Sequence, residues 1–267
     1  RWDYAITSAD RKEPPAEWDG KILVPFALEA KLGGVQRLLG GEEALWYRRS
    51  FEGKPSAMRK TILHFEAVDY RCAVFVNGKS IPVQGGNRHF EDGVHYHQGG
   101  NTPFQLDVTS ALRADGRNDL IVRVEDDTEG WQLRGKQTLD PRGIWYTQVS
   151  GICQTVWLEH VPTSSIRDLK ISTDAETGLM TVRAETYARD THSEMEIVVN
   201  DGEREVARAK GRGSEFRLPV KDAKLWSPDS PHLYDIEATL FDEDGDLVDR
   251  VTSYTGIRTV GKRKDAN

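Results

Sequence analysis

The sequence predicts an all-β chain that folds as two successive β-sandwiches. Short segments in which apolar and polar residues alternate recur along its 267 residues, a pattern typical of strands that bury one face. Helical periodicity is confined to Asp107–Arg113, where we expect one or two helical turns. A linker-like segment, 161–165, separates two strand-rich regions. We therefore predict one domain over residues 1–162 and a second over 163–260.

The first domain is expected to be a jelly-roll sandwich, because a strand-rich region of about 160 residues fits that architecture. Asn77 and Gly78 form a dipeptide that favours a tight hairpin, since both residues accept a positive φ. Trp157 alternates with its neighbours in the last strand, so we expect its side chain in the core. The predicted strands are Leu45–Phe51, Thr61–Phe65, Cys72–Val76, Ile81–Val83, Phe104–Val108, Asp119–Val124 and Gln154–Glu159.

The second domain is expected to be an immunoglobulin-like sandwich, because six or seven strands in about 95 residues match that size. An acidic segment, Asp242–Asp246, lies between its last two strands. A calcium-binding loop would need its glycine one position later, so a hairpin turn is the favoured interpretation. The predicted strands are Ile166–Ile171, Leu179–Ala188, Glu194–Val199, Glu215–Val220, His232–Phe241 and Leu247–Tyr254.

Composition excludes several classes of function. The net charge is −7 and the pI about 5.6, so the chain repels phosphate backbones and is not expected to bind nucleic acid. No stretch approaches the ~18 apolar residues that span a bilayer, so we expect no membrane partner. Two cysteines, Cys72 and Cys153, exclude a disulfide framework or a zinc ribbon. They leave one bridge or two free thiols as alternatives.

Motifs for catalysis, cofactors and metals are missing from the sequence. It contains no Gly-x-Ser-x-Gly, no glycine-rich phosphate loop and no His-Glu-x-x-His, so we predict no cofactor and no metal. His95 and His97 share one face of a strand, but a metal site would need a third ligand, which favours turn or groove histidines. The cluster Glu125–Glu129 could hold a cation, although a solvated loop is the favoured interpretation.

Aromatic residues suggest a binding loop in the first domain. Six of the seven tryptophans precede residue 160, and Trp131 and Trp145 flank the polar segment Gln132–Gly143. Proteins hold sugars with aromatic platforms and planar polar side chains. A long polar loop on a rigid sandwich is also where binding residues tend to lie. The alternative is a loop that packs on a neighbouring domain.

Five blocks of sequence resemble the sugar-binding domain of glycoside hydrolase family 2, which includes β-galactosidases and β-glucuronidases. The second half of the chain is similar to the immunoglobulin-like domain of the same family, at Trp226–Tyr234 and Gly256–Arg258. The blocks occur in the family's order: Trp18–Phe26, Trp46–Phe51, Phe65–Tyr70 with Val74–Gly78, His97–Phe104 with Asp107–Thr109, and Ser150–Glu159.

The resemblance implies a galactose-binding-like jelly roll, an immunoglobulin-like domain and then a (β/α)₈ barrel of about 250 residues. Both catalytic glutamates of the family lie in the barrel, one of them after an asparagine, and this chain has no Asn-Glu dipeptide. We expect residues 261–267 to begin the linker to a missing barrel. No catalytic residue is predicted, and we expect the chain alone to be inactive.

The chain also departs from the family's pattern. Asn101 replaces a tyrosine, Cys153 replaces a tryptophan, and Trp145 occupies the place of an aspartate that helps to bind substrate in several relatives. An insertion covers roughly 84–94. The segment Arg134–Gln137 resembles a subgroup whose loop reaches the active site. The resemblance implies these candidate substrate contacts: Arg134, Lys136, Gln137, Trp145, Tyr146 and His97.

Three hypotheses follow. The leading one is a non-catalytic part of a family 2 β-glycosidase that contacts a β-linked sugar beside the barrel of the same polypeptide. The second is an autonomous carbohydrate-binding module, and the third is a scaffold for folding or oligomerisation, with a homo-oligomeric parent left open. The chain begins at Arg1 without an initiator methionine, which fits a trimmed signal. We expect a periplasmic or secreted location, with the cytoplasm as the alternative.

Overall fold

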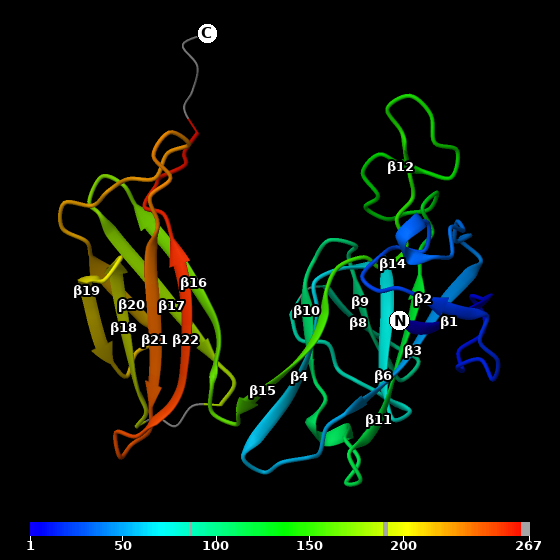
Figure 1. Cartoon of the computed structure of the whole chain (residues 1–267), viewed down its shortest axis with the longest axis horizontal. Helices are drawn as coiled ribbons and strands as arrows, with labels where there is room; N and C mark the ends of the chain where they lie inside the picture. Colours follow the sequence, from blue (N-terminus) through cyan, green and yellow to red (C-terminus); the bar gives the residue numbers. More distant parts are fainter. Residues whose placement is uncertain (86, 189–191, 263–267) are drawn as a thin grey trace. The chain divides into compact units, whose positions relative to one another are not determined.

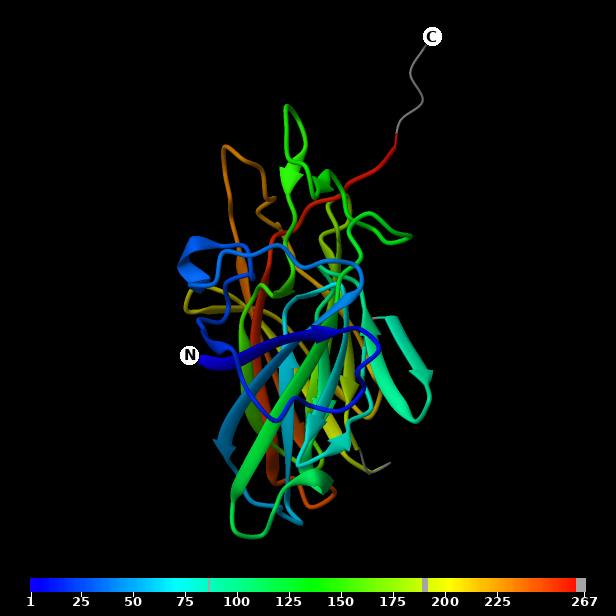
Figure 2. The ribbon, with the colours of Figure 1, turned by 90° about the vertical axis from the view of Figure 1, so that its right-hand side faces the viewer.

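A computed structural model describes residues 1–85, 87–188 and 192–262, and Figures 1 and 2 show the chain in two views. The chain divides into two compact units, Arg1–Val161 and a second unit that begins at Pro162. The described residues form strands and two short 3₁₀ helices, η1 (Lys31–Gly33) and η2 (Thr109–Ala111), without an α-helix. The prediction of an all-β chain of two β-sandwiches is confirmed. Within the described ranges, no helix is long and apolar enough to cross a membrane.

The larger sheet of the first unit has eight antiparallel strands in the order β2-β1-β3-β11-β6-β9-β8, with β7 paired to β6. The central strand β3 buries Leu45 and Tyr47 in the core by alternation. The strand bounds are β1 (Trp2–Ser8), β2 (Gly20–Ile22), β3 (Glu43–Glu52), β6 (Arg71–Val76), β7 (Lys79–Ser80), β8 (Asn87–Glu91), β9 (Val94–Gln98) and β11 (Arg117–Glu125).

A smaller sheet and two short strand pairs complete the first unit. The smaller sheet has the order β10-β4-β15, with β10 (Phe104–Asp107), β4 (Arg59–Phe65) and β15 (Val156–Pro162). An antiparallel pair joins β5 (Val68–Asp69) to β14 (Gly151–Ile152). A parallel pair joins β12 (Gln137–Thr138) to β13 (Tyr146–Thr147).

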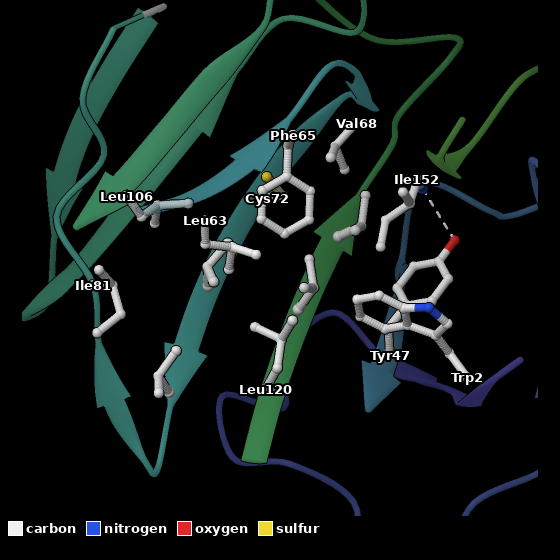
Figure 3. Close-up of a cluster of buried hydrophobic side chains, with 14 of the residues drawn as sticks. Trp2, Tyr47, Leu63, Phe65, Val68, Cys72, Ile81, Leu106, Leu120 and Ile152 are labelled. Atoms are coloured by element: carbon white, nitrogen blue, oxygen red, sulfur yellow. Dashed lines mark hydrogen bonds between the residues drawn. The ribbon is translucent and has the colours of Figure 1, made fainter. Parts of the chain in front are cut away.

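The core of the first unit contains side chains from both sheets (Figure 3). Tyr47 is fully buried, its hydroxyl accepts a hydrogen bond from the Ile152 backbone N–H at 3.1 Å, and Trp2 packs edge-on against its ring. Phe65 stacks on Phe104 with centroids 5.0 Å apart. Burial of each large apolar side chain contributes about 1.5–3 kcal/mol. The loops of the first unit connect strands that are fixed by this packed core.

The second unit is a seven-stranded sandwich around a separate core. Three strands form the sheet β16-β17-β20, and four form the sheet β19-β18-β21-β22. Asp242 Oδ1 accepts hydrogen bonds from the N–H groups of Asp244 and Asp246, which makes the acidic segment a turn between β21 and β22. The bounds are β16 (Ile166–Asp174), β17 (Leu179–Thr186), β18 (Glu194–Asp201), β19 (Arg204–Gly211), β20 (Glu215–Pro219), β21 (Tyr234–Phe241) and β22 (Leu247–Thr255).

Several details differ from the sequence-based expectations. Ile81–Val83 does not form a strand, because Pro82 has no N–H to donate to a ladder. The insertion near 84–94 contributes β8, which pairs with β9. Trp157 is 40% exposed rather than in the core. Cys72 and Cys153 are both free thiols.

Candidate functional site

A long connection between β11 and β14, residues 126–150, is the candidate site and is called the 126–150 loop below. It extends beyond the strand ends of its own unit and carries β12 (green in Figures 1 and 2). The parallel pairing sets Gln137 beside Tyr146 and Thr138 beside Thr147. Trp131, Trp145 and Tyr146 are exposed on it. The loop therefore combines a fixed backbone with exposed aromatic rings.

The base of the loop is buried, and Asp126 is the centre of its hydrogen bonds. Asp126 is only 2% exposed. Its Oδ2 accepts a bond from the Ser150 hydroxyl at 2.6 Å and a weaker one from Gln148 Nε2 at 3.5 Å, and its Oδ1 accepts bonds from Gln132 and Thr128. The solvated loop expected around Glu125–Glu129 is therefore wrong for Asp126, whose carboxylate ties together the two ends of the 126–150 loop.

A second carboxylate, Glu129, closes the loop on itself. It accepts hydrogen bonds from the Thr138 hydroxyl and the Leu139 N–H at 3.1 Å and from Arg134 Nη1 at 3.1 Å. The Leu139 N–H, then Arg134 and Thr138, hold the pKa of the Glu129 carboxyl below its usual range. Arg134 also donates to the carbonyl oxygen of Thr128. The guanidinium is thus engaged within the loop.

Gln137 joins the loop to the strands beneath it. Its Nε2 donates to Asp69 Oδ2 at 3.3 Å, and its Oε1 accepts the Val149 N–H at 2.6 Å. Both ends of this amide are therefore occupied by groups of the first unit. We infer that Gln137 positions the loop, whereas Lys136, Trp145 and Tyr146 are exposed beside it.

Three carboxyl groups meet under the loop: Glu29, Asp69 and Asp126. Asp69 is 7% exposed, and its burial, followed by the charges of Asp126 and Glu29, raises its pKa to about 7. Burial also raises the pKa of Glu29, whose Oε2 accepts the Ser150 N–H at 2.9 Å. Among the described residues, none of the three carboxylates pairs with a basic side chain. This arrangement favours a proton on Asp69 near neutral pH.

These carboxyl groups do not form an accessible catalytic pair. Glycoside hydrolysis needs two carboxyl groups that flank the scissile bond. Glu29 Oε1 and Asp69 Oδ1 are buried without a hydrogen-bond partner, so a glycoside cannot reach them. Sequence reasoning missed Glu29 and Asp69. The signal for Asp69 was its position directly after the buried Val68, inside a block that carries the family resemblance.

His97 lies inside the first unit rather than on the loop surface. It is 0% exposed, stacks on Phe104 with centroids 4.0 Å apart, and contacts the Gly99 carbonyl oxygen through Nε2 at 3.1 Å. Burial lowers its pKa, so the neutral imidazole is favoured. In the part of the chain that the structure describes, no three His, Cys, Asp or Glu residues form a group that could hold a metal.

The structure thus brings five of the six candidate residues onto one loop. Arg134 and Gln137 are held by internal hydrogen bonds, and Lys136, Trp145 and Tyr146 face solvent. An exposed indole, phenol and ammonium can stack on the apolar face of a pyranose and donate hydrogen bonds to its hydroxyls. The arrangement can bind and orient a sugar.

Comparison with known proteins identifies the relatives of this chain. Residues 164–258 match the model of glycosyl hydrolases family 2. The chain is 28% identical to a β-galactosidase of Thermoanaerobacter pseudethanolicus over 82% of its own length and 29% of that protein. It is 26% identical to a β-glucuronidase of Paenibacillus borealis over 81% of its length and 36% of that protein.

Solved structures show the same fold. A β-glucuronidase of Bifidobacterium dentium, complexed with coumarin-3-O-glucuronide, has a TM-score of 0.70 and 24% identity, covering 97% of this chain and 47% of that one. A β-glucuronidase of Bacteroides uniformis has a TM-score of 0.70 and 20% identity, covering 96% of this chain and 33% of that one. The chain spans less than half the length of each of these proteins, and its residues 164–258 are similar to the glycosyl hydrolases of family 2.

Proposed function

We propose that this chain is a non-catalytic part of a family 2 β-glycosidase and that its 126–150 loop contacts the sugar substrate. The observation that carries the proposal is the exposed set of Lys136, Trp145 and Tyr146 on a loop whose base is fixed by buried hydrogen bonds. A preorganised loop loses little conformational entropy when it binds. The sequence relatives are named β-galactosidase and β-glucuronidase, and the solved structures with the same fold are β-glucuronidases.

The remaining parts of the proposal concern the parent polypeptide. The relatives are longer than this chain, which supports a parent whose catalytic barrel supplies the two carboxyl groups. The β-linked sugar would lie between the loop and that barrel. A periplasmic or secreted location and a homo-oligomeric parent also remain proposals.

A specific observation favours a second candidate function, an autonomous carbohydrate-binding module. Hydrogen bonds to residues of the first unit, such as Asp69 and Asp126, hold the base of the 126–150 loop, so the loop is positioned without any other domain. Binding of oligosaccharides by this chain alone would support that function. In the leading proposal, by contrast, the loop contacts the sugar only when the barrel lies beside it and supplies the rest of the binding site.

Hydrolysis assays test the leading proposal. We would assay this chain and the parent polypeptide against a panel of aryl β-glycosides. The expected result is turnover by the parent and none by the chain. In the parent, Trp145→Ala should lower kcat/KM by at least about tenfold, while Leu32→Ala, an exposed change outside the loop, should leave it unchanged.

Other outcomes are equally informative. Unchanged kinetics in Trp145→Ala and Tyr146→Ala parents would favour a scaffold role and overturn substrate contact. Turnover by this chain, lost on substitution of one of its own carboxylates, would overturn the assignment as a non-catalytic part.

A further inference from the structure

β8 (Asn87–Glu91) forms an open edge of the larger sheet in the first unit. Among the strands that the structure describes, it pairs only with β9, and all five of its residues are exposed. The hairpin of these two strands stands at one side of the unit (Figure 2). An edge strand presents unpaired backbone N–H and C=O groups, and another strand can bind to them.

The turn of this hairpin fixes the hydrogen-bonding pattern of β8. Asp92 and Gly93 have φ values of +50° and +78°, as in a two-residue type I′ turn. Such a turn makes Glu91 and Val94, which lie opposite each other, a hydrogen-bonded pair. Hydrogen-bonded and non-hydrogen-bonded pairs then alternate along an antiparallel ladder.

The backbone groups of Arg88 and Phe90 therefore point away from β9. These residues lie opposite His97 and His95 in non-hydrogen-bonded pairs. The other side of β9 agrees with this pattern, because the His95 N–H donates to Ser80 Oγ at 3.0 Å, on the side that faces β6 and β7. The open edge thus carries the N–H and C=O groups of Arg88 and Phe90, which no described strand pairs.

We infer that β8 pairs antiparallel with β8 of a second copy of this chain, about a twofold axis through His89. In this register Arg88 lies opposite Phe90 of the second copy, and Phe90 lies opposite Arg88 of that copy. Each such pair exchanges two hydrogen bonds, so the register uses all the outward-pointing groups of the strand. Identical edges related by a twofold axis form a closed dimer.

The side chains suit this register. Arg88 makes no ion pair within the described residues, and it would lie beside the Phe90 ring of the second copy. That ring is 61% exposed and contacts His95 at a centroid distance of 4.6 Å, and an aromatic face attracts a guanidinium. Asp92, exposed and without an ion pair among the described residues, lies diagonal to Arg88 across the axis, at a separation that long side chains span.

These charges distinguish β8 from an edge that is protected against pairing. Charged side chains on an edge strand ordinarily oppose the approach of another strand. About the axis through His89, however, Arg88 approaches an aromatic ring and a carboxylate rather than another cation. The inference names a surface for the homo-oligomer proposed above, and it does not depend on sugar contact by the 126–150 loop.

Sedimentation velocity of this chain at increasing concentration tests the inference. A single edge pairing is a small interface, so we expect a dimer with a Kd of about 10–100 µM. Phe90→Pro removes an outward-pointing N–H and leaves the ladder to β9 intact, so it should abolish the dimer. Arg88→Glu brings a carboxylate toward Asp92 of the second copy and should raise the Kd at least about tenfold. Arg217→Glu, the same charge change at an exposed position of β20, should leave it unchanged.

Oxidative cross-linking tests the register and does not depend on the stability of the proline variant. Residues 89 of the two copies would form a non-hydrogen-bonded pair, whose Cα atoms lie about 4.5 Å apart, within the range of a disulfide. His89→Cys should therefore cross-link two chains rapidly under a mild oxidant. Glu91→Cys lies opposite Asn87 of the second copy and should cross-link much more slowly.

Three results would overturn the inference. A chain that stays monomeric up to about 500 µM would leave the edge to an extended segment of another protein, and the proposed sugar contact would still stand. A dimer that persists in both Phe90→Pro and Arg88→Glu would use another surface. Equal rates of cross-linking in His89→Cys and Glu91→Cys would exclude the axis through His89.

Discussion

Gln137 on the 126–150 loop donates a hydrogen bond to Asp69 on β5 at 3.3 Å, across 68 positions of sequence. Asp69 is buried next to Gly100, whose backbone lies so close to the carboxylate that a Cβ there would overlap it. The loop is therefore anchored to a buried residue whose carboxylate packs closely against backbone. This contact links the exposed aromatic residues of the loop to the packed core below.

Removal of the Gln137 amide should loosen the loop without unfolding the unit. Gln137→Ala deletes the bond to Asp69 and leaves the Val149 N–H without its acceptor, at a cost of about 1–3 kcal/mol. We expect amide exchange across 126–150 to accelerate at least about tenfold, while exchange in β3 and β11 stays unchanged. Hydrogen exchange measured by mass spectrometry checks this.

A matched control lies on the same loop. Arg142 pairs with Asp140, and both side chains are nearly four-fifths exposed, so Arg142→Ala should leave the exchange rates within error. Equal acceleration in the two variants would contradict a specific anchoring role for Gln137.

The carboxyl cluster should make stability depend on pH. The pKa of Asp69 is raised to about 7 in the folded chain, against an ordinary value near 3.8, so the folded state holds a proton that the unfolded state releases. The contribution of Asp69 to stability should therefore be greatest below about pH 4, fall as the pH rises from about 4 to about 7, and level off above that. Glu29, whose pKa is also raised, adds to the same slope.

Asp69→Asn tests this dependence directly. Asparagine can still accept the Gln137 bond but carries no charge, so we expect a gain of about 1–2 kcal/mol at pH 8 and a flatter profile between pH 4 and 7. Thermal unfolding over this pH range is the measurement. Asp140→Asn, at an exposed site of the loop, should keep the wild-type slope. A profile for Asp69→Asn that parallels the wild type would refute the protonated carboxyl.

Strand alternation was enough to predict most of the fold. Segments such as Leu45–Phe51 and Asp119–Val124 lie inside β3 and β11, because alternating residues of these strands, such as Leu45 with Tyr47 and Leu120 with Val122, pack in the core. The pattern failed where side chains are exposed. β8 (Asn87–Glu91) is exposed throughout, so it has no buried face that alternation could mark. Trp157 is apolar but faces outward on an edge strand, so its hydrophobicity wrongly indicated a core position.

The candidate site was predictable only in part. Composition marked the segment between Trp131 and Trp145 as a polar, aromatic loop, and the structure confirms that position. The buried groups that hold it came from elsewhere: Glu29 lies after β2, and Asp69 lies on β5. Their meeting depends on the closure of the sandwich, which sequence spacing does not reveal. The acidic composition of Glu125–Glu129 wrongly indicated a solvated loop, because one of its carboxylates is buried while the others are partly or fully exposed.

Gly151 offers the sharpest test of how the loop rejoins the core. Its φ is +87°, and a Cβ there would overlap the Tyr47 hydroxyl, which is fully buried and accepts the Ile152 N–H (Figure 3). Gly151→Ala should therefore cost at least about 3 kcal/mol, from left-handed strain and from overlap with a ring that cannot move. Gly135→Ala, at φ +61° in open space, should cost only about 1–2 kcal/mol.

A double-mutant cycle separates overlap from strain. Tyr47→Phe alone leaves the Ile152 N–H unpaired in the core and should cost about 1–3 kcal/mol. In the Gly151→Ala background the same change removes the overlapping oxygen, so the double variant should be more stable than the sum of the two costs predicts. Equilibrium urea unfolding of the four proteins measures the coupling. Strict additivity would mean that backbone strain at Gly151, rather than contact with Tyr47, requires a glycine where the loop ends.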